Sequence, residues 1–178
     1  MNKLANVILI FFLVFLCISC GTNEEHLIHK NSKYYSVDEL KEVFLNNKEE
    51  FSEMVVILLD NDDFYKEMEA RDGDGDARLV AVQDNKYFAD EEWKNIKKFF
   101  LDIQPVDITR YGDSAIGFHF PMNDDGWTTT LFYFVDGSNS YEFGYHQSHY
   151  GIFEEIENEW WIGEEDMHYV KRDWEGFL

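Results

Sequence analysis

The chain has 178 residues, with 36 Asp and Glu against 15 Lys and Arg, which gives a formal net charge of −21 at pH 7. A surface this acidic repels nucleic-acid phosphates and anionic lipid headgroups, which argues against a nucleic-acid partner and against direct membrane binding by the domain surface. Cys17 and Cys20 are the two cysteines, so the chain beyond them has no thiol for a disulfide framework, a thiolate metal site or a nucleophile.

The first 21 residues form a distinct segment. Lys3 is followed by 12 apolar residues, Val7–Ile18, and then by Ser19 and Cys20. The apolar run is shorter than the ~20 residues that a membrane span needs, so we expect cleavage rather than a permanent helix. The segment resembles a bacterial lipoprotein signal peptide with Cys20 as the lipid-bearing residue, with Cys17 where that pattern usually has Leu. An uncleaved N-terminal anchor and an ordinary secretory signal are the alternatives.

This resemblance implies that residues 1–19 are a signal peptide and that residues 20–34 are a lipidated, flexible tether, which leaves residues 35–178 as a single globular domain. It implies a protein outside the cytoplasm, lipid-anchored to the bacterial cell envelope. The acidic Gly21–Glu25 stretch is similar to one that directs some lipoproteins to the outer cell surface. Loss of Lys3 leaves 14 basic residues against 36 acidic ones, and the resulting charge of −22 would attract a basic protein, a cationic peptide or a divalent cation.

Helical patterns dominate the first half of the domain. Ser36 and Glu39 have the spacing of a capping box, and apolar residues then recur at helical spacing to about Asp60. This predicts one long helix, or two short ones with a break at Asn46-Asn47. A further helical turn is expected over 64–68 and a short strand over 79–82. We expect Asp90 to cap a third helix, whose apolar face holds Trp93, Ile96, Phe99 and Phe100.

After Pro105 the apolar period changes from 3.6 to 2. Four runs, 106–111, 115–120, 127–135 and 141–145, are separated by short turns and predict antiparallel strands. In the second run, alternation places Ile116, Phe118 and Phe120 on one face and Ala115, Gly117 and His119 on the other. Residues 131–135 are apolar on both sides, which is typical of a central strand. Residues 160–162 and 167–170 are candidates for terminal strands.

Helices followed by a β-meander indicate an α+β fold, with N-terminal helices packed on one face of a curved antiparallel sheet. The order of elements resembles the cone-shaped cystatin-like and nuclear-transport-factor-like architectures. That resemblance implies a pocket between the concave face of the sheet and the helices. Such folds host enzymes, binding proteins and dimerisation modules, so the fold class does not decide the function.

Asp72, Asp74 and Asp76 are the first candidate site. Small residues between them allow the three carboxylates to turn toward one Ca²⁺ ion, which prefers oxygen ligands. The segment departs from an EF-hand loop at Ala77, where that loop needs Gly, and at Gln83, where it needs Glu. A weak Ca²⁺ loop and a solvated acidic connection are therefore the two interpretations.

Aromatic residues in the predicted strands are the second candidate site. Trp160 and Trp161 must point to opposite faces if their segment is a strand, so only one of them can enter the core. Together with Tyr141 and Tyr145, the other Trp is a candidate for binding a partner or ligand, although aromatic residues in strands more often belong to the core.

These patterns favour a cell-envelope lipoprotein whose acidic, aromatic-rich domain binds a protein or other ligand outside the cytoplasm. An immunity-like or inhibitor role against a basic partner fits the charge. The alternative is an extracytoplasmic hydrolase or metal-dependent enzyme that uses His119, His146 and nearby carboxylates such as Asp124. Convergent carboxylates and imidazoles would favour the enzyme, and an accessible Trp would favour binding.

Overall fold

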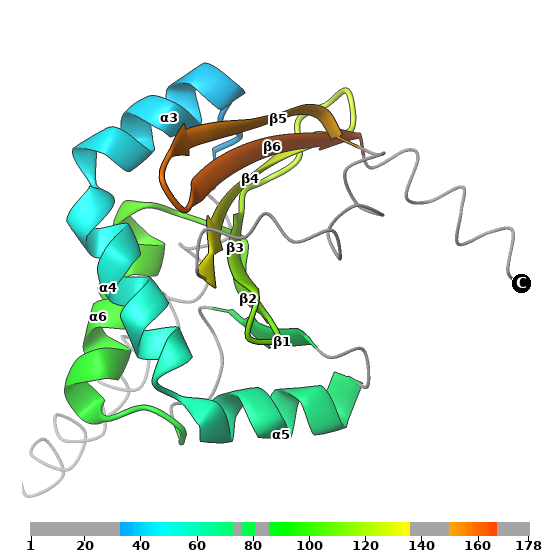
Figure 1. The fold of residues 1–178 in the computed structure, drawn as a ribbon. Coiled ribbons are helices and arrows are strands. Elements are labelled where there is room, and N and C mark those ends of the chain that lie inside the picture. Colours follow the sequence, from blue (N-terminus) through cyan, green and yellow to red (C-terminus); the bar gives the residue numbers. More distant parts are fainter. Residues whose placement is uncertain (1–32, 73–75, 81–85, 136–149, 167–178) are drawn as a thin grey trace, which may run out of the picture. The chain divides into compact units, whose positions relative to one another are not determined.

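The computed structural model describes residues 33–72, 76–80, 86–135 and 150–166, all within one compact unit, Ser32–Leu178. These residues form four helices, α3 (Val37–Asn46), α4 (Lys48–Leu59), α5 (Asp62–Asp72) and α6 (Asp90–Asp102). The strands are β1 (Asp76–Leu79), β2 (Asp107–Tyr111), β3 (Ala115–His119), β4 (Trp127–Phe134), β5 (Tyr150–Glu157) and β6 (Trp160–Asp166) (Figure 1). The predicted α+β class is confirmed.

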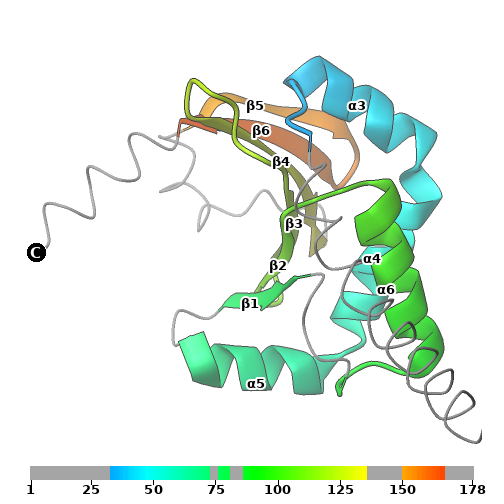
Figure 2. The ribbon, with the colours of Figure 1, turned by 180° about the vertical axis from the view of Figure 1, so that it is seen from behind.

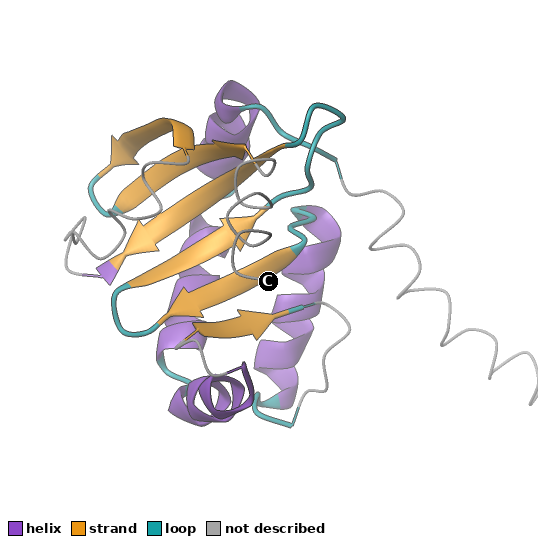
Figure 3. Cartoon of the chain, turned by 90° about the vertical axis from the view of Figure 1, so that its right-hand side faces the viewer, coloured by secondary structure: helices purple, strands orange, loops and turns teal. Residues whose placement is uncertain are grey.

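The described strands form one antiparallel sheet in the order β1-β2-β3-β4-β6-β5. Helices α3, α4 and α6 cover one face, which we call the helix face (Figures 1 and 2). Helix α5 lies along the β1 edge of the sheet (Figure 3). Helices packed against an antiparallel sheet are the predicted arrangement, and the element order is compatible with the cystatin-like resemblance, which stays a prediction. Among the described residues, no helix combines the length and apolar character needed to cross a membrane.

Local hydrogen bonds define the start of α3 and its separation from α4. The Glu39 N–H donates to Ser36 Oγ at 3.4 Å and the Ser36 N–H donates to Glu39 Oε2 at 3.0 Å, which is the predicted capping box. Asn47 separates α3 from α4, and its side-chain amide donates to the Val43 carbonyl at 2.7 Å. The two-helix alternative is therefore correct.

The start of α6 differs from the prediction. Asp90 is the first helical residue and not the cap, and Ala89 in the cap position has no polar side chain. Instead, the Glu92 carboxylate accepts a hydrogen bond from the Ala89 N–H at 2.8 Å. The first N–H groups of a helix have no hydrogen-bond partner within the helix. The Glu92 carboxylate satisfies one of them, and in this way it partly replaces a capping side chain.

Most strands lie close to the predicted runs. The short strand expected over 79–82 instead spans Asp76–Leu79, so that prediction is wrong except at Leu79, and the expected 160–162 run extends to Asp166. Strand β5, at the outer edge beside β6, was not predicted at all. The strands predicted over 141–145 and 167–170 lie outside the described residues.

The core lies between the helix face and the three helices. Phe51 of α4 contacts Phe118 of β3, with ring centroids 5.1 Å apart, and Phe44 of α3 contacts Trp160 of β6 at 4.8 Å. In β4, Leu131 and Phe132 point to opposite faces and both side chains are fully buried. This confirms that β4 is covered on both faces, as its apolar sequence predicts.

Arg110 fixes the corner between α4 and α5 against β2. Its buried guanidinium donates to the Leu58 carbonyl at 3.0 Å and to Asp62 Oδ1 at 3.3 Å, and it lies over the Tyr65 ring at 4.6 Å. Cations suit the C-terminal end of a helix, where carbonyl groups lack partners within the helix. A single buried cation thus sets the path of the chain from α4 into α5.

Candidate binding site on the distal face of the sheet

The sheet face opposite α3, α4 and α6 faces the viewer in Figure 3, and we call it the distal face. The strand register gives it polar and aromatic side chains. Successive residues of a strand point to opposite faces, and the strand register places paired residues side by side. Asp107 lies opposite His119, and Phe132 lies opposite both Gly117 and Trp161. The distal face therefore holds the following residues from β2, β3, β4 and β6: Asp107, Thr109, Tyr111, Ala115, Gly117, His119, Thr130, Phe132, Phe134 and Trp161.

His119 is the centre of a hydrogen-bonded network on this face. Its Nε2 lies 2.9 Å from the Tyr111 hydroxyl, and its Nδ1 lies 3.1 Å from Thr130 Oγ1. Asp107 Oδ1 lies 3.8 Å from Nε2 and accepts a hydrogen bond from the Thr109 hydroxyl at 3.1 Å. Because each hydroxyl can donate or accept, both neutral tautomers of His119 satisfy the network.

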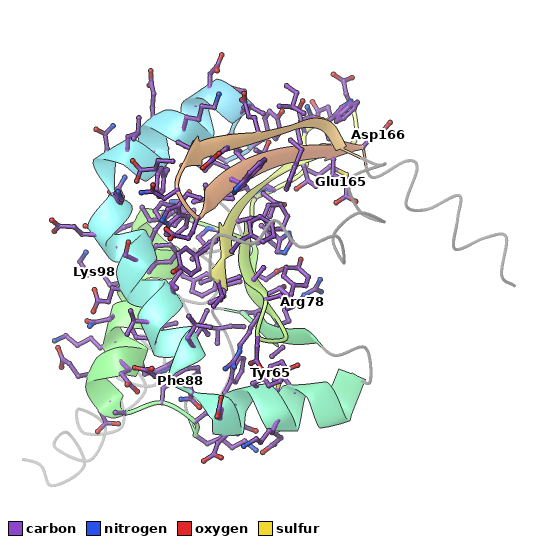
Figure 4. All side chains as sticks on the ribbon, in the orientation of Figure 1. Tyr65, Arg78, Phe88, Lys98, Glu165 and Asp166 are labelled. Carbon is purple, nitrogen blue, oxygen red and sulfur yellow. The ribbon has the colours of Figure 1, made fainter. Side chains whose placement is uncertain are left out.

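The His119 side chain is 22% exposed, and its surroundings favour the neutral imidazole. Burial lowers the pKa of His119 below its ordinary value of 6.5, Asp107 opposes this effect, and the cation of Arg78 adds to it. Arg78 belongs to the same network, since its Nε lies 3.5 Å from Asp107 Oδ2. Figure 4 labels Arg78 on the side of the sheet away from the helices. A neutral imidazole can accept a proton, and here its accepting nitrogen faces the Tyr111 or the Thr130 hydroxyl, through which the proton would have to come.

Gly117 provides the room for this network. A Cβ atom at this position would lie 2.9 Å from Tyr111 Cε2, 3.2 Å from His119 Nε2 and 3.3 Å from Phe132 Cε1. All three distances are shorter than ordinary van der Waals contact. The missing side chain therefore lets the three rings converge over β3.

An aromatic cluster adjoins the network toward β5 and β6. Phe132 and Phe134 are fully buried, and Phe153 and Trp161 pack against them partly buried. The Trp161 ring stacks on Phe153, with centroids 5.2 Å apart and planes at 24°, and contacts Phe134 edge-on at 6.3 Å. A Trp ring held by its neighbours loses little conformational entropy on binding, so Trp161 is a candidate contact for a partner.

Trp160 occupies the other face. It is 4% exposed and packs against the helices, so it belongs to the core and is not available to a partner. The two adjacent Trp side chains thus enter opposite faces, as strand alternation requires, and Trp161 is the candidate that remains. Tyr141 and Tyr145 lie outside the described residues.

Among the other predicted site residues, Asp124 is the one whose side chain the structure describes. Asp72 ends α5 and Asp76 begins β1, but their side chains, like the whole of Asp74, lie outside what the structure describes. His146 also falls outside it. Asp124 is exposed in the turn between β3 and β4, and the carboxylate that the fold brings to His119 is Asp107. Across the described part of the chain, no three His, Cys, Asp or Glu side chains are grouped so that they could hold a metal ion.

Sequence reasoning missed Asp107, Tyr111, Thr130 and Gly117 as members of the site. A usable signal existed in the three-residue turn 112–114, because it pairs Tyr111 with Ala115 and so sets Asp107 opposite His119.

Comparison of the chain with family models, with curated protein sequences and with solved structures found no match.

Proposed function

We propose that the protein is a lipid-anchored binding protein of the bacterial cell envelope, whose acidic domain binds a cationic protein or other ligand outside the cytoplasm. Trp161 carries the binding part of this proposal, because it is partly buried and held by Phe153 and Phe134 beside a polar network. The net charge of −22 without residues 1–19 supports a cationic partner, and an immunity-like or inhibitor role fits that chemistry.

The anchor rests on the N-terminal pattern and is tested separately. Metabolic labelling with a palmitate analogue should tag the wild-type protein, and Cys20→Ala should abolish the label. A label that persists on Cys20→Ala would show that Cys20 is not the lipidated residue.

The binding surface is tested by capturing a partner from envelope extracts with the full-length protein and then measuring its affinity for variants. Trp161→Ala should weaken the affinity by about 2 kcal/mol, or roughly thirtyfold, as for an interface hot spot. Ile152→Ala is the matched control, because this exposed side chain of β5 lies outside the aromatic cluster. Trp160→Ala should instead cost roughly 3–5 kcal/mol of folding stability. Equal affinities of Trp161→Ala and Ile152→Ala for the partner would contradict the proposal that the partner binds at the distal face.

An extracytoplasmic hydrolase is the second candidate, and the His119 network favours it. A neutral imidazole 2.9 Å from a Tyr hydroxyl and 3.8 Å from a carboxylate has the components of a general base. The test is turnover of chromogenic ester, phosphate and glycoside substrates by the wild type and by His119→Gln. Turnover that the substitution abolishes would favour this candidate over a binding role, and turnover that it leaves unchanged would exclude His119 as the base.

A further inference from the structure

A groove lies between α4 and α6. Lys98 of α6 lines it and is labelled beside the helices in Figure 4. Its floor is apolar and consists of Met54, Phe99 and Ile103, whose side chains are almost completely buried. The groove is shallow, with a volume of about 60 Å³, or about 380 Å³ if the open solvent at its mouth is included. It is too small for a drug-sized ligand, so part of one extended side chain is the larger occupant that it suits.

Carboxylates dominate the polar rim of the groove. Glu50 and Glu53 come from α4 and Asp102 comes from α6, and Lys98 is the one basic residue among the lining side chains. Glu53 accepts a hydrogen bond from the Asn95 side chain at 2.6 Å, which holds its carboxylate across the groove. Three carboxylates against one ammonium leave a local excess of negative charge.

Lys98 shows that the rim favours a cation. Its Nζ lies 2.9 Å from Asp102 Oδ2, and the pKa of Lys98 is raised by Asp102 first and also by Glu50 and Glu53. The Lys98 and Asp102 side chains are nevertheless 66% and 57% exposed. Exposed pairs of this kind contribute little to stability, so another cation can replace Lys98 at small cost.

We propose that this groove binds an arginine or lysine side chain from a cationic segment of a partner protein, in place of Lys98. The apolar stem would lie on Met54, Phe99 and Ile103, and the charged head would meet the carboxylates of the rim. Arginine is favoured because its planar guanidinium can bind two carboxylate oxygens at once. The groove lies on the helix side of the sheet, so this contact is separate from the one proposed for Trp161 and goes beyond it.

The test is a calorimetric titration of the full-length protein in detergent with an acetylated, amidated tetra-arginine peptide at low salt. Lys98→Gln should tighten binding about three- to fivefold relative to Lys94→Gln, in line with the small energies of exposed ion pairs. Lys94 is the matched control, because it lies on the same helix, pairs with Glu91 and is similarly exposed at 74%. The triple variant Glu50→Gln, Glu53→Gln, Asp102→Asn should weaken binding about tenfold or more.

Trp161→Ala separates the two surfaces and should leave the peptide affinity unchanged. Equal effects of Lys98→Gln and Lys94→Gln would mean that only net charge matters and would overturn the groove. Unchanged peptide affinity in the triple variant would overturn the proposal that the groove binds a cationic side chain. It would still allow a cationic partner to bind at the distal face. Loss of binding in Trp161→Ala would also overturn the groove proposal, and absence of binding at low salt would count against a cationic partner as a whole.

Discussion

His119 makes the stability of the domain depend on pH in a defined direction. Its folded-state pKa lies below the ordinary value of 6.5, so the unfolded chain binds the additional proton as the pH falls below about 6.5. The stabilisation is therefore complete above this pH and is lost as the pH falls toward the folded-state pKa. In that window the free energy of unfolding of the wild type should fall by up to about 1.4 kcal/mol per pH unit more than that of His119→Gln. Urea denaturation of both proteins at pH 7 and pH 5 measures the difference, and parallel losses would contradict it.

At the residue scale, the sequence predicts alternation but not which face is covered. Adjacent Trp160 and Trp161 had to separate, yet only the pairing of β4 with β6 decides that Trp160 meets the helices. The same holds for Asp107, whose role as neighbour of His119 follows from strand register. These contacts join residues that no local pattern connects.

At the element scale, the capping box of α3 gives a measurable contribution to stability. Ser36→Ala removes the side chain that accepts the Glu39 N–H, and loss of such a cap costs about 0.5–2 kcal/mol. Ser52→Ala is the matched control, because the same change inside α4 replaces serine by a better helix former and should be neutral or slightly stabilising. Chemical denaturation compares the two variants. A loss for Ser52→Ala as large as that for Ser36→Ala would contradict the capping role.

The elements that the sequence missed have identifiable physical causes. Strand β5 shows register shifts between Tyr150 and Ile152 and between Glu155 and Glu157, and these irregularities break the period of 2 on which strand prediction depends. Helix α5 was expected as a single turn, but it extends over Asp62–Asp72. Its start is supported by Asn61, whose side-chain oxygen accepts the Phe64 N–H at 3.0 Å. Strong amphipathic patterns such as α6 were predicted nearly in full.

At the scale of the whole molecule, a bound cation would show as a change in global stability. If Asp72, Asp74 and Asp76 form a Ca²⁺ loop, Ca²⁺ at a hundredfold excess over its Kd should stabilise the folded protein by ~2.7 kcal/mol. For a domain of this size the melting temperature should rise by about 5–10 °C. Differential scanning calorimetry in millimolar Ca²⁺ and in chelator measures this shift, and Asp74→Asn should reduce it. Identical melting temperatures would exclude the loop as a Ca²⁺ site.

Composition and period were sufficient for the architecture, because helices on one face of an antiparallel sheet follow from where the apolar period changes near Pro105. They were insufficient for the candidate site. The His119 network and the Trp161 cluster are assembled from four or more strands, and the α4–α6 groove depends on the packing of two helices. These sites form only when elements distant in the sequence pair or pack, and local sequence patterns do not show which elements meet.

The position of β6 has a consequence for how the protein is made. This strand lies between β4 and β5 in the sheet, although it comes last among the described strands. While the chain is being synthesised, β4 lacks its neighbour β6 until about residue 166 has emerged. Until that point Leu131, Phe132 and Phe134 lie beside an open strand edge. The finished domain buries these three side chains completely. Growing chains and chains that stop before Trp160 are therefore expected to be prone to aggregation and dependent on chaperones.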